Sequence, residues 1–410
     1  MAGDSTRSVH DAEPFDEGSG SVVTPIYQTT TFAFSRADDA RRATIGEKGK
    51  YVYTRWDNPT TARLEGKLAS LEGAEDAAFF SSGMAAISTS VFAFLKAGDH
   101  VVSTKDVYGG TFELMSKMLP RFGVQTSLVE TGNHRALEGA IRQNTAIVYI
   151  ETPTNPTLKL VDIRRAAEAA HGAGALLLVD STFASPVNQK PLELGADVVL
   201  HSATKYLNGH ADVTAGAAAG GAERIGKIKR LRRELGGTLD PHASWLVLRG
   251  MKTMAIRVRA QNENAMALAE FLQGRPEVKV VHYPGLEGHP QHSLAARQMK
   301  GYGGMMSFEL KGTKEEAKRL MERLKLAFLA ASLGGVETLV SQPAAMTHTQ
   351  LTPAEREELG ISDSLIRLSV GIEDKEDLIE DFRQALGGGR GAPASPRRRG
   401  TSVGRHRGRT

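Results

Sequence analysis

The stretch Ala175-Leu176-Leu177-Leu178-Val179-Asp180 is the clearest indication of the fold, because an acidic residue ends an uninterrupted apolar run. A half-exposed strand alternates apolar and polar residues, whereas a strand buried on both faces is a continuous aliphatic run. Such strands are typical of parallel sheets that helices cover on both faces. The run therefore predicts a strand of an α/β sheet, with Asp180 at its carboxyl end.

The same pattern repeats on both sides of this run. Between residues 61 and 220, short apolar runs alternate with stretches of helical periodicity, as in successive βαβ units. The expected strands are 77–80, 100–104, 126–130, 146–151, 175–180, 197–201 and 215–220, and the expected helices lie near 61–72, 84–96, 111–121, 133–143, 162–173 and 188–194. This order predicts a mostly parallel sheet in a large domain.

The chain divides into four predicted regions. Residues 1–60 have turn residues and little helical pattern and are expected to form an extended arm, and 61–260 form the large domain. Residues 261–386 form a smaller α+β domain, and 387–410 form a disordered Arg/Gly-rich tail. Beyond residue 221, helices are expected at 222–234, 246–271, 314–324 and 374–386, and strands at 278–282, 305–310 and 365–370.

The composition excludes several classes of protein. Hydrophobic residues make up 40% of the 410, so global disorder is excluded, and there is no cysteine for a disulfide, a thiolate metal site or a nucleophile. No apolar run approaches the roughly 20 residues needed to span a bilayer, and the polar start of the chain has no secretory signal. We expect a cytoplasmic protein without a membrane partner.

The basic charge belongs to the tail. The net charge is +4, but residues 387–410 hold seven Arg and no Lys, Asp or Glu, which leaves −3 for the rest. A nucleic-acid partner is therefore not expected for the folded body. A nucleic-acid-associated factor that acts through the tail is the non-enzymatic alternative. The histidines show no close i, i+4 pair, so no metal site is predicted.

Polar residues gather where the predicted strands end, which is where open parallel sheets bind ligands. Ser81-Ser82-Gly83-Met84 precedes a helix, and a turn of this kind directs backbone N–H groups at a phosphate, although an ordinary N-cap serine gives the same pattern. Asp180 requires a cationic or protonated partner if it is buried. Lys205 follows a buried strand, where desolvation favours a nucleophilic amine; the alternative is a solvated loop lysine. Phosphate, protonated ring nitrogen and captured aldehyde together indicate pyridoxal phosphate (PLP).

Eight segments make the chain similar to the Cys/Met-metabolism family of PLP-dependent enzymes, of the cystathionine γ-lyase and cystathionine γ-synthase type. These segments are Tyr53-Thr54-Arg55 with Asn58-Pro59-Thr60, Ser81-Ser82-Gly83-Met84, Asp106-Val107-Tyr108-Gly109-Gly110-Thr111, Glu151-Thr152-Pro153-Thr154-Asn155-Pro156, 179–186, 202–210, 332–339 and 367–373. They occur in order from about residue 20 to 386. The resemblance implies fold type I, the aspartate-aminotransferase-like fold.

The resemblance also implies residue roles. Lys205 would form the Schiff base with PLP, Asp180 would keep the ring nitrogen protonated, and Tyr108 would stack on the ring and act as an acid or base. The implied phosphate ligands are Ser82, Gly83, Met84, Ser202 and Thr204, with Tyr53 and Arg55 from a neighbouring subunit that the N-terminal arm contacts. The implied substrate ligands are Arg367 for the α-carboxylate, Ser332, Asn155, which also lies near the ring hydroxyl, and Glu337 for a distal ammonium group. A homodimer would be the minimal active unit and a homotetramer the usual assembly.

The expected reaction is γ-elimination or γ-replacement at Cγ of cystathionine or an O-acylhomoserine, that is, a trans-sulfuration reaction. Methionine γ-lyases usually carry Cys where this chain has Gly110, and O-acylhomoserine sulfhydrylases often have longer chains with insertions. Both remain alternatives. Glu337 favours the cystathionine enzymes but could be a helix-capping or surface acid, so the direction of the reaction and the acyl or thiol preference stay open.

Overall fold

The predicted aliphatic run forms β5, the middle strand of a seven-stranded sheet. In spatial order the strands are β1 (Asp76–Phe80), β7 (Gly216–Gly220), β6 (Val198–His201), β5 (Leu176–Asp180), β4 (Thr145–Glu151), β2 (His100–Thr104) and β3 (Gln125–Val129). Only the two pairs that β7 forms, with β1 and β6, are antiparallel. The mostly parallel sheet is therefore confirmed.

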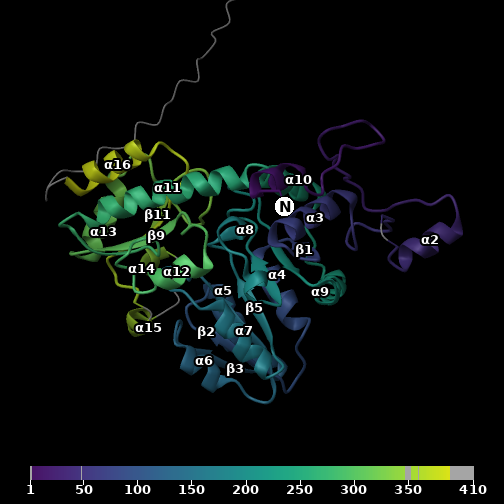
Figure 1. The fold of residues 1–410 in the computed structure, drawn as a ribbon, viewed down its shortest axis with the longest axis horizontal. Coiled ribbons are helices and arrows are strands. Elements are labelled where there is room, and N and C mark those ends of the chain that lie inside the picture. Colours follow the sequence, from purple (N-terminus) through teal and green to yellow (C-terminus); the bar gives the residue numbers. More distant parts are fainter. Residues whose placement is uncertain (1, 48, 347–351, 359, 388–410) are drawn as a thin grey trace, which may run out of the picture.

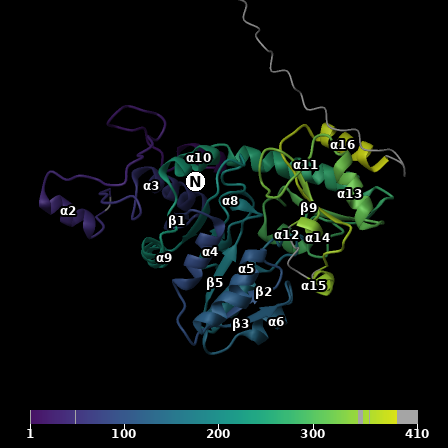
Figure 2. The same cartoon turned by 180° about the vertical axis from the view of Figure 1, so that it is seen from behind.

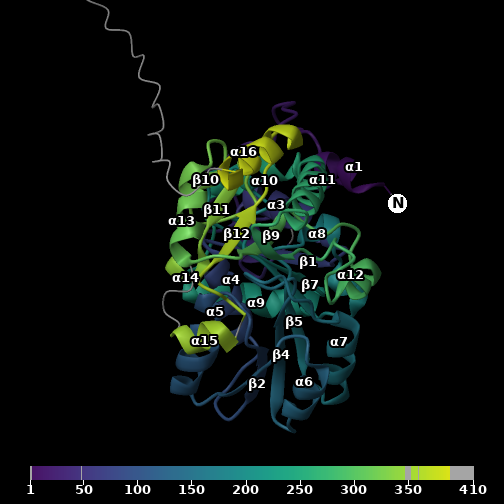
Figure 3. The same ribbon diagram turned by 90° about the vertical axis from the view of Figure 1, so that its left-hand side faces the viewer.

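This computed structural model describes residues 2–47, 49–346, 352–358 and 360–387. The large sheet and its helices form one body, and a second sheet with its own helices lies beside it (Figure 1). After a turn of 90°, β9 (Met305–Leu310) and β12 (Leu365–Ser369) of the second sheet lie above β2 and β4 of the large sheet (Figure 3). The predicted tail lies outside the described residues except for Gly387. No helix of the described residues is long and apolar enough to cross a membrane.

The large sheet is buried on both faces, as the continuous apolar runs predict. Tyr149 and Leu178 belong to the core on one face, together with residues of α4 (Gly83–Phe92). Val148 and Leu177 belong to the core on the other face, together with residues of α7 (Ile163–Gly172). All four strand residues are fully buried. Both faces of the sheet are thus covered, and a ligand would bind at the strand ends.

The second sheet has five strands in the order β10, β11, β12, β9 and β8, and only β10 and β11 are parallel. Their bounds are β10 (Phe328–Leu329), β11 (Leu339–Ser341), β12 (Leu365–Ser369), β9 (Met305–Leu310) and β8 (Val278–His282). Residues of α11 (Met254–Gln273), α13 (Lys314–Arg323) and α16 (Lys375–Gly387) share its core. Two separate sheets support the predicted division into large and small domains, whose boundaries stay a prediction.

The single helix expected at 246–271 is instead two helices, α10 (Pro241–Met251) and α11. The break falls at Lys252 and Thr253, where the backbone N–H of Thr253 donates to Gly250 O at 3.2 Å. The Arg257 guanidinium also donates to Gly250 O, at 2.9 Å. A buried side chain from the second helix thus satisfies the carbonyl at the end of the first.

The N-terminal region is more helical than the sequence indicates. It contains α1 (Asp4–His10) and α2 (Ala37–Thr44), while the rest is an irregular arm that extends away from the large sheet (Figures 1 and 2). The base of the arm is fixed by Lys67, whose buried ammonium pairs with Glu13 at 2.5 Å and donates to Ser8 O at 2.6 Å. These long-range contacts have no counterpart in the local pattern of residues 1–60.

The helix predicted at 188–194 was wrong in its bounds, because the chain there forms α8 (Ser185–Asn188) and the 3-10 turn η3 (Pro191–Leu194). The other helices match the predicted regions or fill short connections. They are α3 (Pro59–Glu72), α5 (Gly109–Glu113), the π turn η1 (Leu114–Met118), the 3-10 turn η2 (Leu119–Phe122), α6 (His134–Ala140), α9 (Ala222–Leu235), α12 (His292–Gln298), α14 (Pro343–Met346) and α15 (Pro353–Glu358).

Candidate active site

Three neighbouring strands bring their polar carboxyl ends together. The last residues of β4 and β5, Glu151 and Asp180, are partners across the sheet, and Asp180 faces Leu200 of β6 on its other side. β6 ends at His201, and the segment that carries Lys205 follows directly. The convergence predicted from the sequence is therefore present.

The connection from β1 into α4 forms a polar cradle. Ser82 caps α4, its hydroxyl accepting a hydrogen bond from the N–H of Ala85 at 3.1 Å. A Cβ built on Gly83 would lie 3.0 Å from Ser202 Oγ, so a side chain at residue 83 would press on Ser202. The first N–H groups of a helix attract anions. Beside the Ser202 hydroxyl, they suit a phosphate.

Thr204, another predicted phosphate ligand, uses its hydroxyl within the chain. Thr204 Oγ1 donates to Ala215 O at 3.1 Å and accepts from Ala215 N at 2.9 Å. These bonds hold the start of the segment that enters β7. A contact between Thr204 and a phosphate stays a prediction.

Asp180 is a buried carboxylate with three hydrogen-bond donors. Its Oδ1 accepts from the backbone N–H and the hydroxyl of Thr182 at 3.0 and 2.6 Å, and its Oδ2 accepts from Tyr149 Oη at 3.4 Å. Burial raises the pKa of Asp180, whereas the two bonds from Thr182 and the nearby His201 oppose that rise. Such a group would be stabilised by a protonated ring nitrogen.

Lys205 is a half-buried amine without a carboxylate partner in the described contacts. Its Nζ donates to Ser332 Oγ at 2.8 Å. Burial, with a smaller effect of the positive charge of Arg367, lowers the pKa of Lys205 to about 8. The neutral amine, which is the form that attacks an aldehyde, is thus populated near physiological pH.

The lowered pKa of Lys205 predicts how the protein without cofactor takes up PLP. The rate of uptake should rise with pH and reach half its maximum near pH 8, because only the neutral amine reacts. Stopped-flow absorbance after mixing with PLP between pH 6.5 and 9.5 measures this rate. A midpoint above pH 10, the ordinary value for lysine, would contradict the environment described here.

Arg367 connects the second sheet to this region. It lies in β12 and is only 4% exposed. One guanidinium nitrogen donates to Asn155 Oδ1 at 3.0 Å and another to Ser332 O at 3.1 Å, and burial lowers the pKa of Arg367 to about 10. Ser332 has a φ of 80°, the left-handed region that is strained for a residue with a side chain. Predicted residues 155, 205, 332 and 367 are therefore joined in one network.

Tyr108 lies at the start of α5 and is 53% exposed. Its backbone N–H donates to Glu151 Oε2 at 2.8 Å. Its ring lies beside residue 110, since a Cβ built on Gly110 would be 2.8 Å from the ring and 2.9 Å from Met84 Sδ. Residue 110 thus lies between the Tyr108 ring and Met84 at the start of α4, and the stacking role of Tyr108 stays a prediction.

Three predicted residues, Tyr53, Arg55 and Glu337, have no described contact with Lys205, Asp180, Arg367 or the cradle at the start of α4. Arg55 donates to the backbone carbonyl of Arg233, and its guanidinium carbon lies 5.7 Å from the centre of the Tyr53 ring. Both residues belong to the projecting arm and are exposed. Glu337 is exposed on the loop that follows Ser332, and a Cβ on Gly335 would lie 3.3 Å from its Oε2. Their predicted roles stay predictions.

Three residues around Asp180 have no role predicted from the sequence: Thr182, Tyr149 and Glu151. Glu151 could have been found, because it ends a buried strand in the same way as Asp180 does. Thr182 and Tyr149 could not, since their bonds to Asp180 depend on which face of the sheet each side chain occupies.

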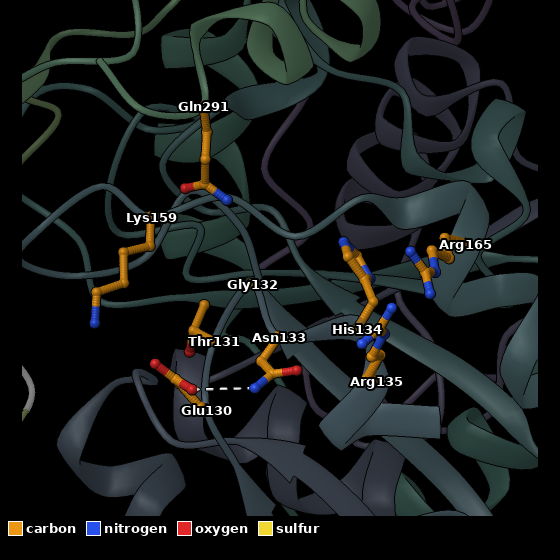
Figure 4. A pocket seen from close by; sticks show the side chains of 9 residues that line it. All are labelled: Glu130, Thr131, Gly132, Asn133, His134, Arg135, Lys159, Arg165 and Gln291. Carbon is orange, nitrogen blue, oxygen red and sulfur yellow. Dashed lines mark hydrogen bonds between the residues drawn. The ribbon is translucent and has the colours of Figure 1, made fainter. Parts of the chain in front are cut away.

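A hollow of about 530 Å³ lies near this region but is distinct from it (Figure 4). Its walls are Glu130, Thr131, Gly132, Asn133, His134, Arg135, Lys159, Arg165 and Gln291, none of which is a predicted site residue. Two of its walls contact Asp106, two residues before Tyr108: Lys159 pairs with the Asp106 carboxylate at 2.9 Å, and the backbone N–H of Asp106 donates to Thr131 Oγ1 at 3.3 Å. Within the described residues, no cluster of three His, Asp or Glu could hold a metal ion.

The residues at the strand ends fit PLP. Lys205 provides a neutral amine, Asp180 a buried carboxylate, and the α4 cradle a place for phosphate. With this α/β sheet, they define a PLP-dependent enzyme of fold type I.

Comparison with known proteins identifies the family. A model of the Cys/Met metabolism PLP-dependent enzymes matches residues 5–387, and the chain belongs to this family. An L-methionine gamma-lyase from Fusobacterium nucleatum subsp. polymorphum is 49% identical over 370 residues, 90% of this chain and 94% of that protein. A cystathionine gamma-lyase from Bacillus subtilis is 47% identical over 382 residues, 93% and 98% of the two chains. The solved cystathionine gamma-synthase from Xanthomonas oryzae pv. oryzae superposes with a TM-score of 0.89 at 42% identity, over 94% and 98% of the two chains.

Proposed function

We propose that this enzyme catalyses γ-elimination or γ-replacement at Cγ of cystathionine or an O-acylhomoserine. The observation that carries this choice is the packing around Gly110. A Cβ at this position would lie 2.8 Å from the Tyr108 ring and 2.9 Å from Met84 Sδ. The cysteine usual in methionine γ-lyases would therefore require Tyr108 or Met84 to move.

The chain's own side chains account for binding and proton transfer. PLP, when bound, supplies an electron sink for negative charge that develops on the substrate carbons. Arg367 binds the α-carboxylate, for which a guanidinium fork is suited. Lys205 Nζ accepts the proton from Cα, and the Tyr108 hydroxyl donates a proton to the leaving sulfur or oxygen. Asp180 holds the proton on the ring nitrogen through its negative charge.

Product analysis tests the proposal. We would give the PLP-loaded protein L-cystathionine alone, and in a second reaction O-succinyl- or O-acetylhomoserine with cysteine, and identify products by mass spectrometry. 2-Oxobutyrate, ammonia and cysteine from the first reaction would establish a γ-lyase, and cystathionine from the second a γ-synthase. Pyruvate and homocysteine from cystathionine would reveal β-elimination and overturn the assignment to Cγ.

Methionine γ-lyase is the second candidate, because the Fusobacterium relative with that activity is 49% identical to this chain. L-Methionine as the sole substrate separates the two. Release of methanethiol from L-methionine at a higher rate than the consumption of L-cystathionine in the separate reaction would favour methionine γ-lyase. O-acylhomoserine sulfhydrylase activity would appear as homocysteine formed from O-acetylhomoserine and sulfide.

We further propose that the N-terminal arm packs on a second copy of the chain. The arm exposes several large apolar side chains that nothing in one chain covers in the described structure: Phe15, Val22, Val23, Ile26 and Ile45. Exposed apolar surface of this kind marks interaction sites. Tyr53 and Arg55 would reach the partner's phosphate cradle, so a homodimer would be the smallest active unit and a homotetramer is the expected assembly.

Complementation between two impaired variants, assayed at a PLP concentration too low to load Arg55→Ala, tests the role of Arg55. Arg55→Ala should weaken PLP binding about ten- to hundredfold, because a charge-assisted hydrogen bond contributes on the order of 1.5–3 kcal/mol. A mixed dimer of Arg55→Ala with Lys205→Ala should recover activity, since one of its two sites has both residues intact. Subunits would be exchanged in dilute denaturant and assayed after refolding. Mixtures that stay inactive, although mass spectrometry detects mixed dimers, would refute the shared site.

A further inference from the structure

A buried carboxyl group at the centre of the site has no role in the reaction proposed above. Glu151 ends β4 and is only 4% exposed. Its Oε2 accepts a hydrogen bond from the backbone N–H of Tyr108 at 2.8 Å, and the backbone N–H of Asn155 donates to the same carboxyl group. Glu151 therefore joins the segment that carries Tyr108 to the segment that carries Asn155.

Glu151 is also the strand partner of Asp180, so two carboxyl groups end adjacent buried strands. Two buried carboxyl groups on adjacent strands do not both ionise readily, because a charge on one raises the free energy needed to ionise the other. The two carboxyl groups differ in the hydrogen-bond donors that surround them. Asp180 receives hydrogen bonds from the Thr182 hydroxyl and N–H and from Tyr149, with His201 nearby, whereas the described donors to Glu151 are two backbone N–H groups.

The charges around Glu151 favour its neutral form. Asp180 and Asp106 are the acidic groups that act on it, and Asp106 is itself paired with Lys159 at 2.9 Å. The phenol of Tyr149 is a further titratable group that faces Glu151. Burial first, and the charge of Asp180 second, raise the pKa of Glu151 well above its usual range, against the opposing effect of its two backbone N–H donors.

We propose that Glu151 is a positioning residue that remains a neutral carboxylic acid, fixes the Tyr108 and Asn155 segments, and leaves Asp180 as the charged carboxylate at the ring nitrogen. The two acidic residues then have different roles. Asp180 carries the charge that the cofactor needs, and Glu151 holds the backbone that sets the position of the Tyr108 ring. This inference rests on the proposed placement of Tyr108 and Asp180 against PLP.

The test compares Glu151→Gln, which keeps an uncharged acceptor of the same shape, with Glu151→Ala, which removes the acceptor. Glu151→Gln should keep the PLP dissociation constant, kcat and KM within about threefold of the wild type. Glu151→Ala should weaken PLP binding by about tenfold, diminish the visible circular dichroism of bound PLP, and lower kcat more than KM, because a buried N–H loses its partner. PLP binding is measured by titrating protein freed of cofactor.

Infrared difference spectra of the folded wild type and Glu151→Gln provide a second measurement that does not depend on Glu151→Ala folding. At pH 7.5 the wild type should show the carbonyl band of a buried protonated carboxylic acid, and Glu151→Gln should lack it. Absence of that band in the wild type, or a Glu151→Gln enzyme as impaired as Glu151→Ala, would mean that Glu151 is charged and would overturn the proposal. Normal PLP binding and dichroism in Glu151→Ala would overturn the positioning role.

Tyr108→Leu distinguishes this inference from the assignment on which it rests. If Tyr108 lies on the cofactor, this change alters the visible circular dichroism whatever Glu151 does. An altered spectrum in Tyr108→Leu with an unaltered one in Glu151→Ala would refute the role of Glu151 alone. Unaltered spectra in both would refute the placement of Tyr108 and with it the inference.

Discussion

Replacement of Lys205 by alanine is expected to lower turnover by on the order of 10⁴-fold or more, since removal of a covalent catalytic residue has effects of at least this size. The variant should also lose the visible absorbance of PLP bound through a Schiff base, because Lys205 is the half-buried neutral amine at the strand ends. Steady-state kinetics and absorbance spectra of the purified protein measure both effects. A variant that keeps both would exclude Lys205 as the attachment point.

Lys190 provides a matched control for this prediction. It is also a buried lysine whose pKa burial lowers, but its ammonium donates to the backbone carbonyl of Leu71 and not to a residue of the site. Lys190→Met should retain the visible absorbance, and any loss of activity should follow a loss of thermal stability. Equal losses of visible absorbance in both variants would mean that removal of any buried lysine has this effect, and that the effect of Lys205→Ala is not specific to position 205.

The order of elements could be predicted because buried strands and their polar ends are local features. Asp180 and Lys205 each follow an apolar run, and the sheet brings both to one edge, as expected for parallel strands. Arg367 is different, because β12 belongs to the second sheet, and its bonds to Asn155 and Ser332 join residues far apart in the chain. Only the resemblance to the family indicated that Arg367 belongs to the site.

What the sequence did not predict depends on side-chain direction and long-range contacts. Glu151 and Asp180 each end a buried apolar run, so the sequence does not distinguish them. Their unequal hydrogen bonds depend on where the Thr182 and Tyr149 side chains lie in the folded chain. The helix break before α11 depends on the Arg257 side chain reaching back to Gly250 O. Local periodicity contains no information on either arrangement.

Substitution of Arg367 by leucine should lower kcat/KM by about 10²–10³-fold, mainly through KM, because the proposed charged, bidentate partner of the substrate carboxylate is lost. The same change should raise the midpoint pH for PLP uptake, since the positive charge of Arg367 contributes to the lowered pKa of Lys205. Steady-state kinetics and the stopped-flow uptake measurement test the two effects. They are independent, because uptake requires no substrate.

Arg367→Lys separates the charge of this residue from its geometry. Lysine keeps a cation but lacks the planar fork with which two guanidinium nitrogens donate to Asn155 Oδ1 and Ser332 O, and so it cannot pair bidentately with a carboxylate. The variant should therefore show the wild-type pH dependence of PLP uptake but a kcat/KM well below that of the wild type. A lysine variant with full kcat/KM would show that a point charge suffices and that the fork does not orient the substrate. A leucine variant with unchanged KM would place the α-carboxylate elsewhere, since no carboxylate could then depend on Arg367 for its binding.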